Sequence, residues 1–195
     1  MLTINHKFNG QLRKRQRTDT IIIHHSASHD ASAAEIHNWH IQRGWAGIGY
    51  HFVIRKNGGI ETGRPIDTIG AHAGAKNNTH SLGICLTGNF MNNYPATHQI
   101  DALRGLYGLL MGMYGNHIEV LLHTQVSNTL CPGFKFDLNS VLNAKNNASN
   151  TNDWASDALA WGTSNKITDG TRPLDYVTRQ ELITMLYRFN NLMKG

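Results

Sequence analysis

The sequence predicts an α/β protein in which helices flank a mixed central β-sheet, followed by a small helical module. Short apolar runs rich in β-branched residues alternate with segments of helical spacing through most of the chain, as in a sheet covered by helices. A polar stretch then separates this region from two further helical patterns. With 40% hydrophobic and 16% charged residues, the composition is that of an ordinary globular protein.

The first expected strand is DTIIIHHSAS, at residues 19–28. Three consecutive isoleucines are too few for a helix and rich in β-branching, so they predict a buried strand. The strand ends in His24 and His25. Because neighbouring residues of a strand point to opposite faces, only one of the pair can bind a given metal ion, and the strand pattern does not decide which.

A helix is expected from Ser32 to Arg43, because Ser32 and Glu35 form a capping-box pattern at its start. A hairpin is expected in GYHFVIRKNGGIETGR, where residues 56–59 have the composition of a turn that needs positive φ. The predicted α/β region is completed by a strand at 81–90, a long amphipathic helix at 96–115 and a short strand at 117–124.

Three parts are expected along the chain: an α/β domain at 1–143, a linker at 144–152 and a helical module at 153–195. The linker has no apolar pattern and several residues that favour turns or coil. The module has helical patterns around 154–161 and 178–190. Because so short a module is near the lower limit for folding alone, we expect it to pack on another surface.

The charge and hydropathy of the chain limit which partners it is expected to bind and where in the cell it is expected to be. The net charge of +5 lies entirely within residues 1–149, and such a basic surface attracts polyanions, whether nucleic acid or the anionic polymers of a cell wall. The longest apolar stretch, at 106–114, is interrupted by glycines and shorter than the roughly 18 residues of a membrane-spanning helix. No apolar segment follows the basic N-terminal residues, so we expect no secretory signal peptide and a protein kept in the cytoplasm.

The two cysteines call for separate explanations, because a chain without an export signal is not expected to rely on disulfides. Cys85 lies in an apolar strand-like run and is expected to be buried. Cys131 precedes a proline and follows His123 by eight residues, which makes it the better metal ligand. Two histidines and one cysteine suit Zn²⁺ and leave one position for a water that attacks an amide. Spacing alone does not choose the histidines, because the chain has 12.

Four segments follow one another between residues 18 and 137: IIIHHSAS, GWAGIGYHFVIRKNGGIETGR, GAHAGAKNNTHSLGICLTGNF and HTQVSNTLCPGF. In content, order and spacing they resemble the type-2 N-acetylmuramoyl-L-alanine amidases, the family of phage lysozyme-amidases and animal peptidoglycan recognition proteins. Four motifs in the right order are far more specific than any one of them. The resemblance implies an amidase-like mixed sheet with flanking helices in the first domain.

The resemblance implies a zinc site formed by His24, His123 and Cys131. It also implies that Tyr50 is catalytic, since its hydroxyl can hydrogen-bond the reacting water or the developing oxyanion. Thr129 is the second catalytic residue implied; some phage members have a lysine there, and a hydroxyl stabilises an oxyanion less than a positive charge does. For His72 the resemblance implies contact with the substrate, with simple packing as the alternative.

The C-terminal segment 153–189 resembles a single S-layer homology motif, a module that anchors proteins to anionic secondary cell-wall polymers. Arg179 matches the arginine that contacts the polymer in that family, a role that suits a guanidinium group. Such modules usually act in threes. With one motif, wall binding would need a homo-oligomer, or the segment would instead pack on the amidase domain.

The function implied is hydrolysis of the amide between N-acetylmuramic acid and L-alanine in bacterial peptidoglycan. We expect a phage endolysin that stays in the host cytoplasm until a holin-type pore releases it to the wall. The expected partners are peptidoglycan and an anionic wall polymer, and nucleic acid is not expected. Two alternatives stay open: a protein that binds peptidoglycan without cutting it, and a regulator of an RNA polymerase that uses the basic arm at 7–17.

Overall fold

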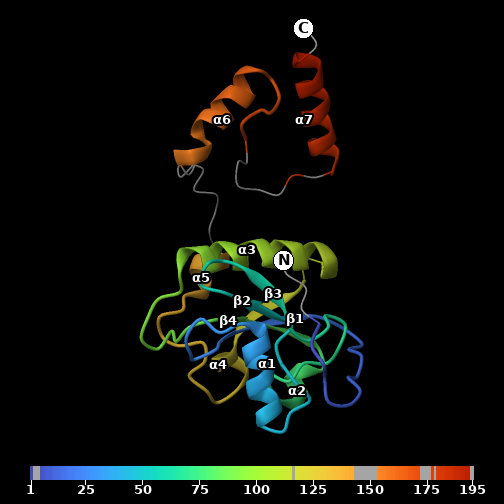
Figure 1. The fold of residues 1–195 in the computed structure, drawn as a ribbon, viewed down its shortest axis with the longest axis vertical. Helices are drawn as coiled ribbons and strands as arrows, with labels where there is room; N and C mark the ends of the chain where they lie inside the picture. Colours follow the sequence, from blue (N-terminus) through green and yellow to red (C-terminus); the bar gives the residue numbers. More distant parts are fainter. Residues whose placement is uncertain (2–4, 116, 143–152, 172–176, 178, 194–195) are drawn as a thin grey trace. The chain divides into compact units, whose positions relative to one another are not determined.

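The computed structural model describes residues 1, 5–115, 117–142, 153–171, 177 and 179–193. The chain divides into two compact units, Met1–Leu142 and Asn143–Gly195. Figure 1 shows the sheet within the first unit and helices within the second. The linker expected at 144–152 lies outside the described residues.

The first unit is built on a five-stranded sheet in the order β3-β2-β4-β1-β5. Strand β1 (Thr20–His25) runs parallel to both of its neighbours, β4 (Ser81–Leu86) and β5 (Glu119–Leu122). Strand β2 (Phe52–Ile54) is parallel to β4 and antiparallel to its hairpin partner β3 (Ile60–Thr62). The predicted mixed sheet is therefore confirmed.

Helices cover both faces of this sheet (Figure 1). One face is covered by α3 (Thr97–Tyr114) and α5 (Leu138–Leu142), and the other by α1 (Ala33–Gln42). Two short helices, α2 (Gly74–Asn78) and α4 (His123–Val126), lie in the connections on the α1 side. Helices α1 and α3 confirm the two long helices expected here, whereas the sequence patterns did not predict α2, α4 or α5.

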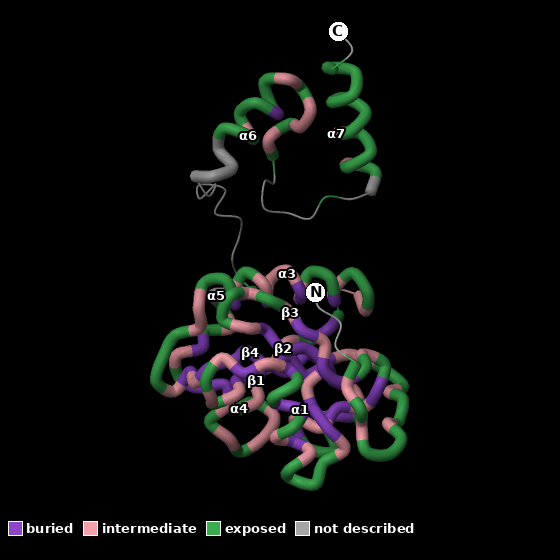
Figure 2. Tube along the Cα trace, in the orientation of Figure 1, coloured by how far each residue is buried: buried purple, intermediate pink, exposed green. Residues whose placement is uncertain are grey.

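The two faces of the sheet pack into different hydrophobic clusters. Ile21 and Ile23 of β1 point toward α3, whose buried side chains follow the spacing of one helical face: Gln99, Leu103, Leu106 and Leu110. On the other face, Ile36 of α1 packs with Val53 and Cys85. Figure 2 shows strands β1, β2 and β4 as buried along their whole length. The expectation that Cys85 is buried is confirmed.

Two local sequence patterns determine the start of α1 and the turn of the β2–β3 hairpin. The Ser32 hydroxyl accepts a hydrogen bond from the Glu35 backbone N–H at 3.2 Å, and the Glu35 carboxylate accepts one from the Ser32 N–H at 2.9 Å. This is the predicted capping box at the start of α1. In the turn of the β2–β3 hairpin, Gly58 has a φ of +83°, which a residue without a side chain adopts most easily.

The second unit contains α6 (Asp153–Ser164) and α7 (Arg179–Leu192), which confirms the two helices expected there. The rings of Trp161 and Phe189 meet edge to face, with centroids 6.3 Å apart. Among the residues of this unit whose burial the structure describes, only Gly162 is buried. Several apolar side chains of α7 are exposed, including Leu182, Ile183, Leu186 and Tyr187. No helix in the described parts of the chain is long and apolar enough to cross a membrane.

Candidate metal centre

The three predicted metal ligands lie together at one edge of the sheet. One nitrogen from each of His24 and His123 and the sulfur of Cys131 all lie within 4.8 Å of one another. The His24 Nδ1 atom is 3.8 Å from the Cys131 Sγ atom, and the two histidine rings have centroids 4.4 Å apart. Within the described residues, no other group of three histidine, cysteine or acidic side chains is arranged to hold a metal ion.

Strand topology explains how the two histidines meet. Because β1 and β5 are adjacent and parallel, their carboxyl ends lie at the same edge of the sheet. His24 is near the end of β1, and His123 follows β5 directly as the first residue of α4. The next residue in β1, His25, points to the opposite face, where its Nδ1 atom accepts the Phe90 backbone N–H at 3.0 Å. The structure therefore places His24, and not His25, among the candidate metal ligands, a choice that the strand pattern leaves open.

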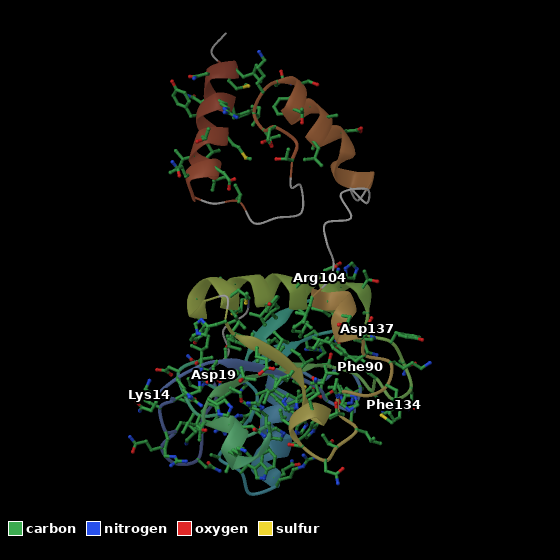
Figure 3. All side chains as sticks on the ribbon, turned by 180° about the vertical axis from the view of Figure 1, so that it is seen from behind. Lys14, Asp19, Phe90, Arg104, Phe134 and Asp137 are labelled. Atoms are coloured by element: carbon green, nitrogen blue, oxygen red, sulfur yellow. The ribbon has the colours of Figure 1, made fainter. Side chains whose placement is uncertain are left out.

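Backbone contacts hold Cys131 against the same edge. The Thr124 N–H donates to the Cys131 carbonyl at 2.9 Å, and the His25 N–H donates to the Cys131 sulfur at 3.4 Å. The loop that follows is anchored by the Lys135 N–H, which donates to the Phe90 carbonyl at 2.9 Å. At Gly133, with φ of +106°, a side chain would collide with the Phe90 backbone. Figure 3 shows Phe90 beside the loop that carries Phe134.

The protein environment determines the protonation states of the three candidate ligands, His24, His123 and Cys131. Burial, with added repulsion from His123 and His25, lowers the pKa of His24 well below its usual value. Burial also lowers the pKa of His123, so both imidazoles are neutral at pH 7 and keep a free lone pair. Burial raises the pKa of the Cys131 thiol to about 11, although the hydrogen bond from His25 opposes the shift. The thiol is therefore protonated at pH 7 and would release its proton on binding a metal ion.

These donors fit a tetrahedral zinc ion. Zinc bonds of about 2.3 Å to sulfur and about 2.0–2.1 Å to nitrogen place the two donor atoms about 3.5 Å apart in a tetrahedron. The observed 3.8 Å between His24 Nδ1 and Cys131 Sγ differs from this by a few tenths of an ångström. Two neutral imidazoles and one thiolate form a mixed donor set that zinc accepts, and three protein ligands leave one coordination position for reaction.

Tyr50 lies beside the three candidate ligands, with its ring centroid 5.1 Å from that of His24. Its position is fixed from both sides: the preceding Gly49 N–H donates to His40 Nδ1 at 3.0 Å, and the Arg64 N–H donates to the Tyr50 carbonyl at 2.8 Å. Burial and the neighbouring cysteine thiols raise the pKa of the Tyr50 hydroxyl well above its usual value. The phenol is therefore a hydrogen-bond donor at neutral pH.

The structure places the other predicted site residues in different surroundings. The Thr129 hydroxyl accepts the Cys131 N–H at 3.2 Å, which leaves its own proton available for donation. The His72 Nδ1 atom lies 3.0 Å from His24 Nε2, a contact that sequence reasoning missed, and substrate contact by His72 stays a prediction. Arg179 is the first residue of α7 in the second unit, and its side chain lies outside the described part of the structure.

A sequence model of the N-acetylmuramoyl-L-alanine amidase family matches residues 14–134. The chain belongs to this family. Because the amidase match ends at residue 134, it does not include the second unit, and the S-layer homology resemblance stays a prediction.

Curated relatives of this chain include phage endolysins and an animal recognition protein. The endolysin of Enterobacteria phage K11 is 37% identical over 132 residues, covering 64% of this chain and 86% of the relative. The endolysin of Escherichia phage T7 is 35% identical over 134 residues with the same coverage. Peptidoglycan-recognition protein LB of Drosophila melanogaster is 38% identical over 125 residues, covering 58% of this chain and 53% of the relative.

Solved structures agree with the family assignment. The N-acetylmuramoyl-L-alanine amidase LysC from Clostridium intestinale URNW superposes with a TM-score of 0.69 and 35% identity, covering 74% of this chain and 97% of that chain. Drosophila recognition protein LB superposes with a TM-score of 0.58 and 33% identity, covering 63% of this chain and 79% of that chain. The predicted amidase family and its fold are therefore confirmed.

Proposed function

We propose that this chain is a zinc-dependent N-acetylmuramoyl-L-alanine amidase that hydrolyses the bond between N-acetylmuramic acid and L-alanine in bacterial peptidoglycan. The observation that carries the proposal is the meeting of His24, His123 and Cys131 at the sheet edge, with a protonated tyrosine beside them. The family match and the endolysin relatives support the same activity. A related recognition protein, at 26% identity, was solved in complex with monomeric diaminopimelic acid-type peptidoglycan.

The residues of the site have separate roles in this proposal. His24, His123 and Cys131 would hold the metal, and a bound zinc ion acidifies water and polarises the substrate carbonyl. The Tyr50 hydroxyl, protonated at neutral pH, donates a hydrogen bond to the oxygen on which negative charge develops. The Thr129 hydroxyl proton adds a second, neutral donor, which stabilises this charge less than a lysine would.

The relatives favour an endolysin over a recognition protein. Four similar curated proteins are phage endolysins, of which this chain covers 86% of the length. We therefore propose that the protein acts on the host cell wall after release from the host cytoplasm. The presence of Cys131 also favours cleavage over binding alone, because binding needs no thiolate at the sheet edge.

For the second unit, we propose that Arg179 binds an anionic wall polymer. The support is the S-layer homology resemblance and the suitability of guanidinium for anionic groups. In sedimentation with purified cell walls, Arg179→Ala of the full chain should leave more protein in the supernatant than wild type does. Equal sedimentation of the two proteins would assign wall binding to the amidase domain alone.

The experiment that tests the proposed activity distinguishes the bond that is cut. Purified peptidoglycan is incubated with the protein, and new N-terminal alanine and new reducing sugar ends are measured together. Amide cleavage releases N-terminal alanine without new reducing ends. A rise in reducing ends alone would mean that a glycosidic bond is cut, and no rise in either would leave a binding protein.

A further inference from the structure

The two ring nitrogens of His24 face different partners. Its Nδ1 atom lies 3.8 Å from Cys131 Sγ, on the side of the candidate metal centre. Its Nε2 atom lies 3.0 Å from Nδ1 of His72, and the two rings meet edge to face at 84° with centroids 5.0 Å apart. His72 therefore contacts the one nitrogen of His24 that would not face the metal.

The chemistry of imidazole gives this contact a direction. A neutral imidazole carries one N–H and one free lone pair. If His24 binds a metal through Nδ1, its proton must be on Nε2, and this N–H donates a hydrogen bond to His72 Nδ1. In the reverse arrangement His72 would donate, the His24 proton would sit on Nδ1 facing Cys131, and His24 could not bind the metal there.

The fold holds the His72 ring in the orientation that this contact needs. Gly83 of β4 and Gly70 form a cradle: a Cβ atom at Gly83 would lie 2.6 Å from the His72 ring, and one at Gly70 would lie 2.5 Å from it. The backbone is fixed as well, since the His72 N–H donates to Asn78 Oδ1 at 3.0 Å. The ring therefore has little freedom to turn its Nδ1 atom away from His24.

The burial of the His72 Nε2 atom is hard to explain if the His72 ring serves only to pack against its neighbours. Among the described residues, the His72 Nε2 atom is buried and has no hydrogen-bond partner. Leaving a buried polar atom unpaired costs stability, so an apolar ring would fill the same cradle more favourably. The benefit of a histidine here must come from its other nitrogen, which contacts His24.

We propose that His72 is a positioning residue of the metal centre, which accepts a hydrogen bond from the Nε2–H of His24 and so commits His24 to bind metal through Nδ1. This inference rests on the proposed zinc centre but not on amide hydrolysis. It gives His72 a role different from the substrate contact expected from the sequence. Partners of this kind fix the tautomer and the orientation of a ligand histidine.

Two substitutions separate this role from packing. His72→Phe keeps a ring in the cradle but removes the acceptor, whereas His72→Asn places an amide oxygen near the position of Nδ1. In competition with a chelator at pH 7, we expect His72→Phe to bind zinc about 10–100-fold more weakly than wild type, and His72→Asn to recover most of that loss. His98→Phe, at an exposed histidine of α3, is the control and should bind zinc as wild type does.

Thermal unfolding of each variant, followed by circular dichroism, shows whether it folds. A folded His72→Phe protein with wild-type zinc affinity would overturn the proposal, and so would equal weakening by Phe and Asn. ¹⁵N-histidine NMR of the zinc-loaded wild type gives an independent readout that does not depend on any variant. We expect His24 to be metal-bound at Nδ1 and protonated at Nε2, with the His72 Nδ1 atom unprotonated; zinc at His24 Nε2 would contradict this.

Measurements on the wild-type protein distinguish a failure of the proposed role of His72 from a failure of the proposed amidase activity. A wild type that takes up no zinc would overturn both the zinc centre and the role of His72. A wild type that binds zinc with the expected tautomers but leaves peptidoglycan intact would overturn only the proposed activity.

Discussion

Cys131→Ser is expected to lose stoichiometric zinc and to hydrolyse peptidoglycan at least about a thousandfold more slowly than wild type. Cys131 supplies the one sulfur of the candidate centre, beside His24 and His123. A serine hydroxyl gives up its proton far less readily than a thiol and is a poor ligand for zinc beside two neutral imidazoles. Without the metal, neither the water nor the carbonyl is activated.

Metal analysis of the purified variants, together with release of N-terminal alanine, measures both effects. The matched control is Cys85→Ala, which removes the other thiol of the chain from the neighbouring strand β4. Cys85 lies outside the group of three ligands, so this variant should keep one zinc ion per chain. Retention of zinc and of wild-type turnover by Cys131→Ser would contradict the assignment of the ligand.

Tyr50→Phe is expected to keep its zinc but to lower kcat about 100–1000-fold, the loss seen when one donor to an oxyanion is removed. The ring of Tyr50 packs beside His24, and a phenylalanine preserves that contact while deleting the hydroxyl. Because the charge on the substrate oxygen develops in the transition state, KM should change much less than kcat.

Steady-state rates with a soluble muropeptide substrate, measured on zinc-loaded protein, give kcat and KM separately. Tyr94→Phe is the matched control, since Tyr94 is 73% exposed and its ring is contacted by Lys135. Tyr94→Phe should keep the wild-type kcat. A Tyr50→Phe enzyme as fast as this control would remove Tyr50 from the catalytic residues.

The sequence predicts the sheet, the two long helices of the first unit and the capping box of α1, because each has a local signal. The three isoleucines of β1 and the Ser32–Glu35 pair are such signals. The short helices α2, α4 and α5 have only four or five residues each, too few to show a helical period. Their positions depend on contacts within the folded chain.

The site shows the same division between local and long-range information. Alternation along β1 indicates that His24 and His25 face opposite sides, but only the folded sheet shows that Phe90 lies on one side and Cys131 on the other. The contact between His24 and His72 joins residues 48 positions apart, and no spacing rule predicts it. The family resemblance, rather than the pattern of residues, supplied the choice of ligands from 12 histidines.

The central claim is that one metal ion, held by His24, His123 and Cys131, is required for amide hydrolysis. Its most direct test is a titration of zinc into protein stripped of metal by a chelator, with release of N-terminal alanine from peptidoglycan followed at each step. The account predicts negligible activity without zinc and a linear rise that ends at about one equivalent per chain. Full activity in the metal-free protein, or no alanine release after one equivalent has bound, would contradict it.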